Sequence, residues 1–197
     1  MAEKRDSPYI WVTWLAKIMS GDITCQWQGW FLTQNKLTKK QPNNFDLADW
    51  KINHTKMLTE LKEKLIKDKY MPILEKPIKY NIPNSDAVIC GKPDCVIENK
   101  DTVIVYDCKT GKERDSDQVQ IKLYMYLLSK GEFSEKKIKG VVLYKDKEIE
   151  IKDLPENFEE NFNFFVDRLI SAEPSTKNPG DDCRFCDIIK DDCPERV

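Results

Sequence analysis

The stretch ICGKPDCVIENKDTVIVYDCK, residues 89–109, decides the fold. Its two apolar runs predict two strands joined by a polar turn at residues 98–101. Side chains alternate along a strand, so one face of the second strand carries two valines, an acid and a base: Val103, Val105, Asp107 and Lys109. The valines direct this face inward. Burial of the Asp107 carboxylate and the Lys109 ammonium costs free energy, so we expect these groups to have polar partners or a functional role.

A second acid is available close by. Asp94 lies on the preceding strand and can bring its carboxylate to the same edge as Asp107. Two converging carboxylates beside Lys109 suit a hard divalent cation that acts on a phosphate. The stretch therefore indicates metal-dependent chemistry at one rim of a sheet.

Composition predicts one soluble domain. The 197 residues are 40% hydrophobic and 34% charged, which is sufficient for a core. The net charge is −2, so any nucleic-acid site must be a local patch. No apolar run approaches the ~20 residues that span a bilayer, and residues 9–19 lack a signal-peptide cleavage site. We expect a cytoplasmic protein without membrane contact.

Hydrophobic periodicity predicts an α/β fold. Helices are expected over residues 7–19, 24–35, 46–70, 115–130 and 156–171. Strands are expected over residues 72–82, 86–90, 94–98, 102–108, 139–144 and 148–151. Residues 1–6 are expected to form a loose tail and residues 35–44 a polar, basic loop. The order predicts a central mixed β-sheet flanked by helices.

The domain organisation follows from the same order of elements. We expect a single domain over residues 1–197. It comprises an N-terminal helical part (7–70), an α/β core (71–172) and a Cys-rich tail (173–197) that packs on the N-terminal part.

Three polar residues lie on the apolar faces of predicted helices. His54, the only histidine, follows Trp50 by one turn, and a lone inward histidine is more often a core residue than a ligand. Gln120 and Tyr124 are one turn apart on the face that packs on the sheet, where a glutamine is unexpected.

The cysteines point to metal ligation. Seven is an odd number, and the chain lacks secretory features, so a disulfide framework is disfavoured. The tail carries C-x2-C-x6-C, formed by Cys183, Cys186 and Cys193. Three thiolates leave a tetrahedral site incomplete, and Cys25 is the remaining candidate because the other cysteines, Cys90, Cys95 and Cys108, lie on predicted strands. Zinc and an iron–sulfur cluster both fit four thiolates.

The order of these motifs resembles the PD-(D/E)XK nuclease superfamily. An early cysteine is followed by a histidine, G-x-x-D, D-x-K, Q-x-x-x-Y and C-x2-C-x6-C-P, over residues 7–194. Within the superfamily the pattern is similar to the RecB-like branch, notably CRISPR-associated RecB-like exonucleases and AddB-type nuclease domains. The resemblance implies a restriction-endonuclease-like core and a four-iron, four-sulfur cluster, with zinc as the alternative.

The resemblance assigns roles by position. It implies Mg²⁺ or Mn²⁺ on His54, Asp94, Asp107 and the backbone carbonyl of Cys108. Asp94, Asp107 and Lys109 are the implied catalytic residues, and Lys109 orients and polarises the attacking water. Gln120 and Tyr124 support the site and contact the substrate strand. The implied cluster ligands are Cys25, Cys183, Cys186 and Cys193. The chain departs in having Asp rather than Glu at 107 and a cysteine at 108.

The implied function is a metal-dependent deoxyribonuclease, an exonuclease on single-stranded DNA ends, in repair or CRISPR processing with partner proteins. A non-catalytic DNA-binding or adaptor protein with a structural zinc or iron–sulfur site on the four cysteines is the alternative, and a structural zinc protein is a third reading. Candidate phosphate contacts are Lys36, Lys39, Lys40, Lys112 and Arg114, although solvated lysines are commoner.

Overall fold

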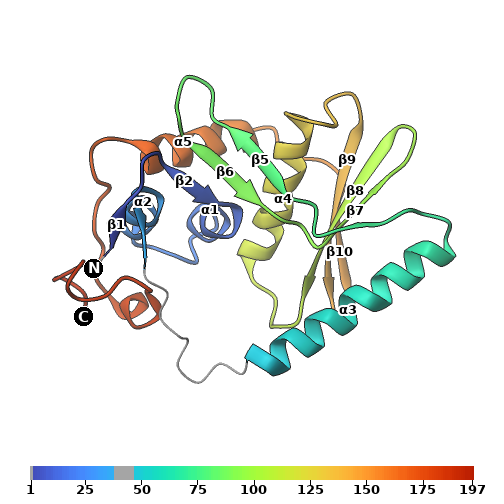
Figure 1. Ribbon diagram of the computed structural model, residues 1–197, viewed down its shortest axis with the longest axis horizontal. Coiled ribbons are helices and arrows are strands. Elements are labelled where there is room, and N and C mark those ends of the chain that lie inside the picture. The colour runs from blue at the N-terminus through green and yellow to red at the C-terminus, as the bar shows by residue number, and fades with distance from the viewer. Residues whose placement is uncertain (1, 38–46) are drawn as a thin grey trace.

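The computed structural model describes residues 2–37 and 47–197. The main sheet of this part of the chain has five strands (Figure 1). In the order β10-β9-β8-β7-β4 these are Glu148–Ile151, Lys137–Tyr144, Thr102–Lys109, Cys95–Glu98 and Ile73–Leu74. β8 and β9 are parallel and the other pairs antiparallel. The predicted mixed sheet, including the β7–β8 hairpin, is confirmed.

Two smaller sheets account for the other strands of the described residues. β2 (Tyr9–Trp11), β6 (Val88–Gly91) and β5 (Ile78–Asn81) form a three-stranded sheet in which β2 and β6 are parallel. β1 (Glu3–Lys4) pairs with β3 (Asn35–Lys36).

Helices cover both faces of the main sheet. They are α1 (Val12–Met19), α2 (Gln26–Gln34), α3 (Leu47–Lys67), α4 (Asp115–Ser129) and α5 (Phe158–Ile170), with a short 3₁₀ helix η1 (Asp181–Phe185). α4 packs on β8 and β9, and α1 packs on α4, whereas the long α3 crosses the opposite face (Figure 1). Among the described residues, no helix is long and apolar enough to cross a membrane.

The alternation along β8 divides its side chains between these layers. Val103 and Val105 are fully buried in the cluster that contains α4. On the other face, Cys108 packs in a second cluster with Leu61 and Leu65 of α3. Because the period is two, Asp107 shares the α4 side with the valines. β8 therefore sends successive side chains into two different layers.

Pairing between distant segments corrects the predicted helix over residues 7–19. The helix begins only at Val12, because Tyr9–Trp11 pairs in parallel with β6. Trp11 lies opposite Cys90 in this ladder and is 39% exposed, so it is not part of the buried stripe of α1. Tertiary pairing outweighs the local helical pattern at this point.

The predicted strand over residues 72–82 is also corrected. Its first part, β4, pairs with β7 in the main sheet, whereas its second part, β5, pairs with β6 in the smaller sheet. Between them the chain turns at Glu75, where φ is +49°, and passes Pro77, which has no N–H for a ladder. One expected strand is therefore two strands in separate sheets.

The expectations for the N-terminus are partly wrong. Residues 1–6 do not all form a loose tail, because Glu3 and Lys4 pair with Lys36 and Asn35. Most of the loop expected over residues 35–44, and the predicted start of the third helix at residue 46, lie outside the described residues.

The C-terminal tail lies against the N-terminal helices. Ile188 is fully buried and packs with Trp27 and Leu32 of α2. The Ala2 backbone N–H donates to the Asp192 carboxylate at 3.1 Å, so the start of the described chain lies beside the tail (Figure 1).

Candidate active site and cysteine pocket

A cleft of about 770 Å³ lies at the C-terminal end of β8. Its lining comes from both helical layers and from the sheet between them. It includes every residue that the sequence pattern assigned to metal, catalysis or substrate: His54, Asp94, Asp107, Cys108, Lys109, Gln120 and Tyr124. Residues that are far apart in the sequence thus share one cleft.

Asp94 connects three elements. It precedes β7, and its Oδ2 accepts a hydrogen bond from the Cys108 backbone N–H of β8 at 2.6 Å. The same oxygen lies 3.1 Å from Nε2 of His54, on α3. The hydrogen bond with Asp94 raises the pKa of His54 above its usual value, although burial opposes this. The ring of Trp50 stacks on His54, with centroids 5.1 Å apart.

Asp107 is buried and held by two side chains. One oxygen, Oδ2, lies 2.7 Å from Nζ of Lys109, and Oδ1 accepts a hydrogen bond from Nε2 of Gln120 at 3.1 Å. Burial raises the pKa of Asp107 to about 6, against the opposing charge of Lys109. The negative charge of the buried Asp107 carboxylate is stabilised at neutral pH by the positive charge of Lys109.

Lys109 is a half-buried cation with acceptors on several sides. Its Nζ donates to Oε1 of Gln120 at 2.9 Å and lies 3.7 Å from Oδ1 of Asp117. Burial lowers the pKa of Lys109, but the charges of Asp107, Asp117 and Asp94 reverse the direction, and the net pKa is raised. Lys109 is therefore protonated in this arrangement and can stabilise negative charge, but cannot accept a proton.

The hydrogen bonds of Gln120 explain why a glutamine occupies a core position of α4. Its amide oxygen accepts from Lys109, and its NH₂ donates to Asp107 and, at 3.2 Å, to the hydroxyl oxygen of Tyr124. The amide can satisfy both ions in only one orientation, so it fixes the two side chains relative to each other. Tyr124 is 2% exposed and supports this network from below. Contact of either residue with a substrate strand stays a prediction.

Gly91, the glycine of the G-x-x-D motif, allows close packing beneath the cleft. A Cβ at this position would lie 2.6 Å from Cε1 of Tyr124 and 2.7 Å from Cγ2 of Val12. β6 can therefore approach α4 and α1, and the segment that carries Asp94 is brought to the end of β8.

Asp117 belongs to the same network, and the sequence reasoning missed it. Its Oδ2 accepts from the Tyr144 hydroxyl at 2.8 Å and from the Arg114 backbone N–H at 3.1 Å. It is 7% exposed, and its other oxygen faces Lys109. The available signal was its position three residues before Gln120, on the same side of α4.

The cleft also has a basic lining. Lys112 and Arg114, two predicted phosphate contacts, line it, and so do Lys17 and Lys51, which the sequence reasoning did not select. None of these four forms an ion pair with another described residue. Of the other predicted contacts, Lys36 lies in β3 outside the cleft lining, and Lys39 and Lys40 lie outside the described residues.

The cleft presents the donors that a hard cation prefers. Two carboxylates and an imidazole line the cleft together with Cys108, and Mg²⁺ and Mn²⁺ favour oxygen and nitrogen donors. The two carboxylates are at present paired with His54 and Lys109. Within residues 2–37 and 47–197, no three His, Cys, Asp or Glu side chains form a group arranged to hold a metal ion.

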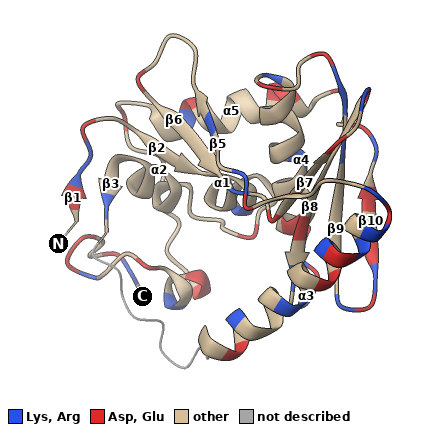
Figure 2. Cartoon of the chain, turned by 45° about the vertical axis from the view of Figure 1, so that its right-hand side comes forward, with Lys and Arg blue, Asp and Glu red and all other residues tan. Residues whose placement is uncertain are grey.

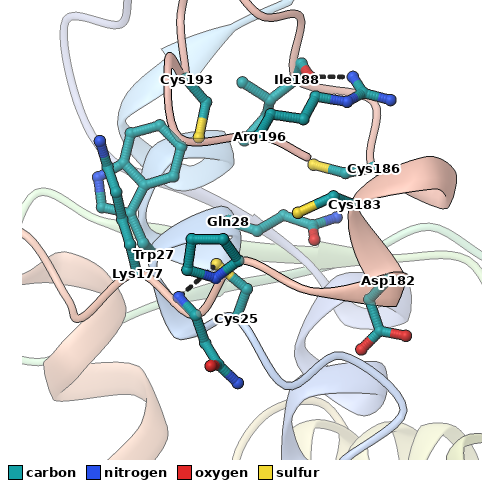
Figure 3. A pocket seen from close by; sticks show the side chains of 12 residues that line it. Cys25, Trp27, Gln28, Lys177, Asp182, Cys183, Cys186, Ile188, Cys193 and Arg196 are labelled. Carbon is teal, nitrogen blue, oxygen red and sulfur yellow. Dashed lines mark hydrogen bonds between the residues drawn. The ribbon is translucent and has the colours of Figure 1, made fainter.

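A second, small pocket contains the four cysteines that the motif pattern selected. Figure 3 shows the sulfur atoms of Cys25, Cys183, Cys186 and Cys193 directed toward one space. Cys25 is the residue before α2, and the other three belong to the tail. All seven cysteines have free thiols, and the remaining three lie on β6, β7 and β8 as predicted.

Backbone amides approach two of these sulfurs. The Asn178 N–H donates to Sγ of Cys25 at 3.4 Å, and the Gly180 N–H donates to Sγ of Cys183 at 3.5 Å. Burial raises the pKa of the Cys186 thiol. Such a thiol stays protonated unless a metal displaces the proton. Lys177 closes one side of the pocket and lies 4.6 Å from the ring centroid of Trp27.

Comparison with known proteins agrees with this geometry. The fold is similar to a solved structure described as the crystal structure of SSO0001, with a TM-score of 0.59 and 19% identity, over 98% of this chain and 89% of that one. At that identity the likeness supports the fold alone. No curated protein sequence matches the chain significantly. The sequence model of the PD-(D/E)XK nuclease superfamily matches residues 17–191, which include Asp94, Asp107 and Lys109, and the chain therefore belongs to this superfamily.

Proposed function

We propose that the protein is a metal-dependent deoxyribonuclease of the RecB-like branch, acting as an exonuclease on single-stranded DNA ends. Membership of the superfamily implies nuclease activity on phosphodiester bonds. The observation that carries the proposal is the network in which Gln120 holds Lys109 and Asp107 together, in the cleft that Asp94 also lines. A protein that only binds DNA has no need to hold a buried acid in fixed contact with a lysine.

The residues of the cleft have different roles in the proposed reaction. His54, Asp94, Asp107 and the carbonyl of Cys108 would hold Mg²⁺ or Mn²⁺, which supplies charge neutralisation at the phosphate and a bound water of lowered pKa. The protonated Lys109 stabilises the negative charge that develops on the phosphate oxygens. Gln120 keeps the ammonium and the Asp107 carboxylate oriented, so little reorganisation is required during the reaction.

The basic lining supports DNA as the substrate. Figure 2 shows acidic and basic residues interspersed along α3 and in several loops, in agreement with the net charge of −2. Against this background Lys17, Lys51, Lys112 and Arg114, which line the cleft and pair with no described acid, provide the local attraction that a phosphate backbone requires.

We further propose that Cys25, Cys183, Cys186 and Cys193 ligate a four-iron, four-sulfur cluster, with zinc as the alternative. The convergence of four thiols and the two N–H···S contacts fit such a group, because hydrogen bonds to sulfur tune cluster sites. A single zinc ion needs sulfurs about 3.8 Å apart, from the tetrahedral Zn–S length. Either group would be held by the same four side chains, which line one pocket.

The nuclease assignment is tested by digestion of 5′- and 3′-labelled single-stranded DNA, duplex DNA and RNA with Mg²⁺ or Mn²⁺. We expect wild-type protein to shorten single-stranded DNA from its ends, and Lys109→Ala to lower turnover by about 10²–10³-fold. Lys36→Ala, a lysine outside the cleft lining, is the matched control and should behave as wild type. Wild-type turnover in Lys109→Ala would remove the assignment, and binding without cleavage would favour the non-catalytic alternative.

A further inference from the structure

Two exposed tryptophans line the active-site cleft. Trp11 ends β2 and is 39% exposed, and Trp50 lies in the first turn of α3 and is 40% exposed. The other tryptophans, Trp14, Trp27 and Trp30, are buried or half-buried. Single exposed apolar residues are ordinary, but two tryptophans in one polar cleft need a separate explanation.

The two rings come from layers on opposite faces of the main sheet. Trp11 leads into α1, which packs on α4, and it is paired with Cys90, next to the G-x-x-D segment. Trp50 belongs to α3, which covers the other face of the sheet. The end of β8, with Asp107, lies between these layers, so a chain that crosses the cleft passes both rings.

Each ring is held by an aromatic neighbour and accompanied by a cation. Trp11 makes a T-shaped contact with Tyr9 at 5.4 Å, and Trp50 stacks on His54 at an interplanar angle of 22°. Lys17 of α1 and Lys51 of α3 line the same cleft without an ion pair to any described residue. Aromatic rings combined with cations along a groove are the usual means of binding unpaired nucleic acid.

We propose that the cleft binds an unpaired strand whose bases stack on Trp11 and Trp50, while Lys17 and Lys51 contact its phosphates. This rests on the proposed function for the choice of nucleic acid as ligand. In a duplex the bases are already stacked on each other, and their faces are closed to a protein ring. The two tryptophans therefore give the site a preference for single strands that phosphate contacts alone cannot give.

The test measures binding without cleavage, in the presence of EDTA, by fluorescence anisotropy. The ligands are labelled oligothymidylate and an abasic oligodeoxyribonucleotide of the same length, which has the phosphates but no bases. Trp11→Leu and Trp50→Leu remove the aromatic face and keep an apolar side chain, and Trp11→Phe keeps a ring. Phe164→Ala is the control, because Phe164 is 51% exposed on α5 and outside the cleft lining.

We expect each Leu variant to weaken oligothymidylate binding by about tenfold, within the roughly 5- to 150-fold range of base stacking. Trp11→Phe and Phe164→Ala should bind within about twofold of wild type. No variant should change binding of the abasic strand. Equal losses on both ligands, unchanged binding in both Leu variants, or no binding by wild type would overturn the proposal. Trp-dependent binding by a protein that cleaves nothing with Mg²⁺ or Mn²⁺ would leave the stacking site standing and remove only the nuclease.

Discussion

The active-site cleft and the cysteine pocket differ in how their polar groups are satisfied. In the cleft, Asp94, Asp107 and Lys109 have partners from neighbouring elements of the sheet and of α4. In the pocket, four thiols line one space, and their polar contacts are with backbone N–H groups, such as those of Asn178 and Gly180. The polar groups of the cleft are paired with one another, whereas the thiols of the pocket have few polar partners.

The supporting elements differ in the same way. The cleft residues stand on β8, α3 and α4, which pack in the two larger core clusters. The pocket joins the start of α2 to a tail whose regular structure is a 3₁₀ helix of five residues. Side chains on packed elements hold their geometry by themselves, and those on a tail depend on cross-links. The first site should lose function when altered, and the second should lose stability.

The largest effect is expected from Asp107→Ala. Loss of this carboxylate removes a proposed metal ligand and the partner of Lys109, so we expect turnover to fall by about 10³-fold or more. Tm should change by only a few degrees, because Gln120 still accepts from Lys109 and the Asp117 carboxylate lies 3.7 Å from it. The check is single-stranded DNA digestion together with thermal unfolding. Asp153→Ala, at a 73% exposed side chain, is the matched control, and a variant that is unfolded at the assay temperature would break the comparison.

The second effect concerns the cysteine pocket. Cys25→Ser should abolish the visible absorbance and the iron and sulfide content of protein purified without oxygen. We expect it to lower Tm by about 10 °C, by analogy with loss of a cross-link between distant segments. Turnover at a temperature where the variant is folded should stay near wild type.

The control for this change is Cys90→Ser, on β6, which should keep both iron and absorbance. Zinc in place of iron and sulfide would select the alternative metal. Equal stability of Cys25→Ser and wild type, with neither metal present, would leave the pocket without a role in stability.

An intermediate effect is expected at Asp117, which acts through Lys109. Asp117→Asn keeps the shape but removes the charge 3.7 Å from Nζ of Lys109, so we expect kcat to fall by about tenfold and KM to stay constant. Tyr144→Phe removes only one hydrogen bond to Asp117 and should cost less than about fivefold. Steady-state kinetics measure both, and a change confined to KM would show that Asp117 positions substrate and not Lys109.

The smallest effect is expected at the basic lining. Lys112→Ala should weaken DNA binding by a few-fold and lower the slope of log Kd against log salt concentration by about one. Lys36→Ala should leave both quantities unchanged, because Lys36 lies outside the cleft lining. Anisotropy titrations between low and physiological salt measure the slope. Identical slopes for the two variants would mean that Lys112 does not contact phosphate.

Local pattern was sufficient for several parts of the site. The period of two along β8 placed Asp107 on the inner face, and the helical period placed Gln120 and Tyr124 one turn apart beneath the cleft. The spacing of Cys183 and Cys186 likewise directed two sulfurs to one side of the tail. These inferences hold because side-chain direction depends on neighbours close in sequence.

Other features required contacts between distant segments. Trp11 entered the cleft because β2 pairs with β6, and Asp94 reached His54 because β7 and α3 meet at the same rim. Asp117 is part of the network through Lys109 of β8 and Tyr144 of β9. No local period encodes such pairings, since their free energy comes from burial and hydrogen bonding across the fold.

The sequence by itself determined which side chains of β8 and of α4 face inward. It also provided the order of the motifs and the four cysteines that are candidate ligands. Only the tertiary structure decided that a histidine, two acids and a lysine share one cleft, that two tryptophans line it from opposite faces of the sheet, and that Cys25 meets the tail. The physical reason is the distance along the sequence over which each effect acts. Periodicity relates residues within one helical turn, or two residues apart on a strand, whereas a site forms where whole layers pack.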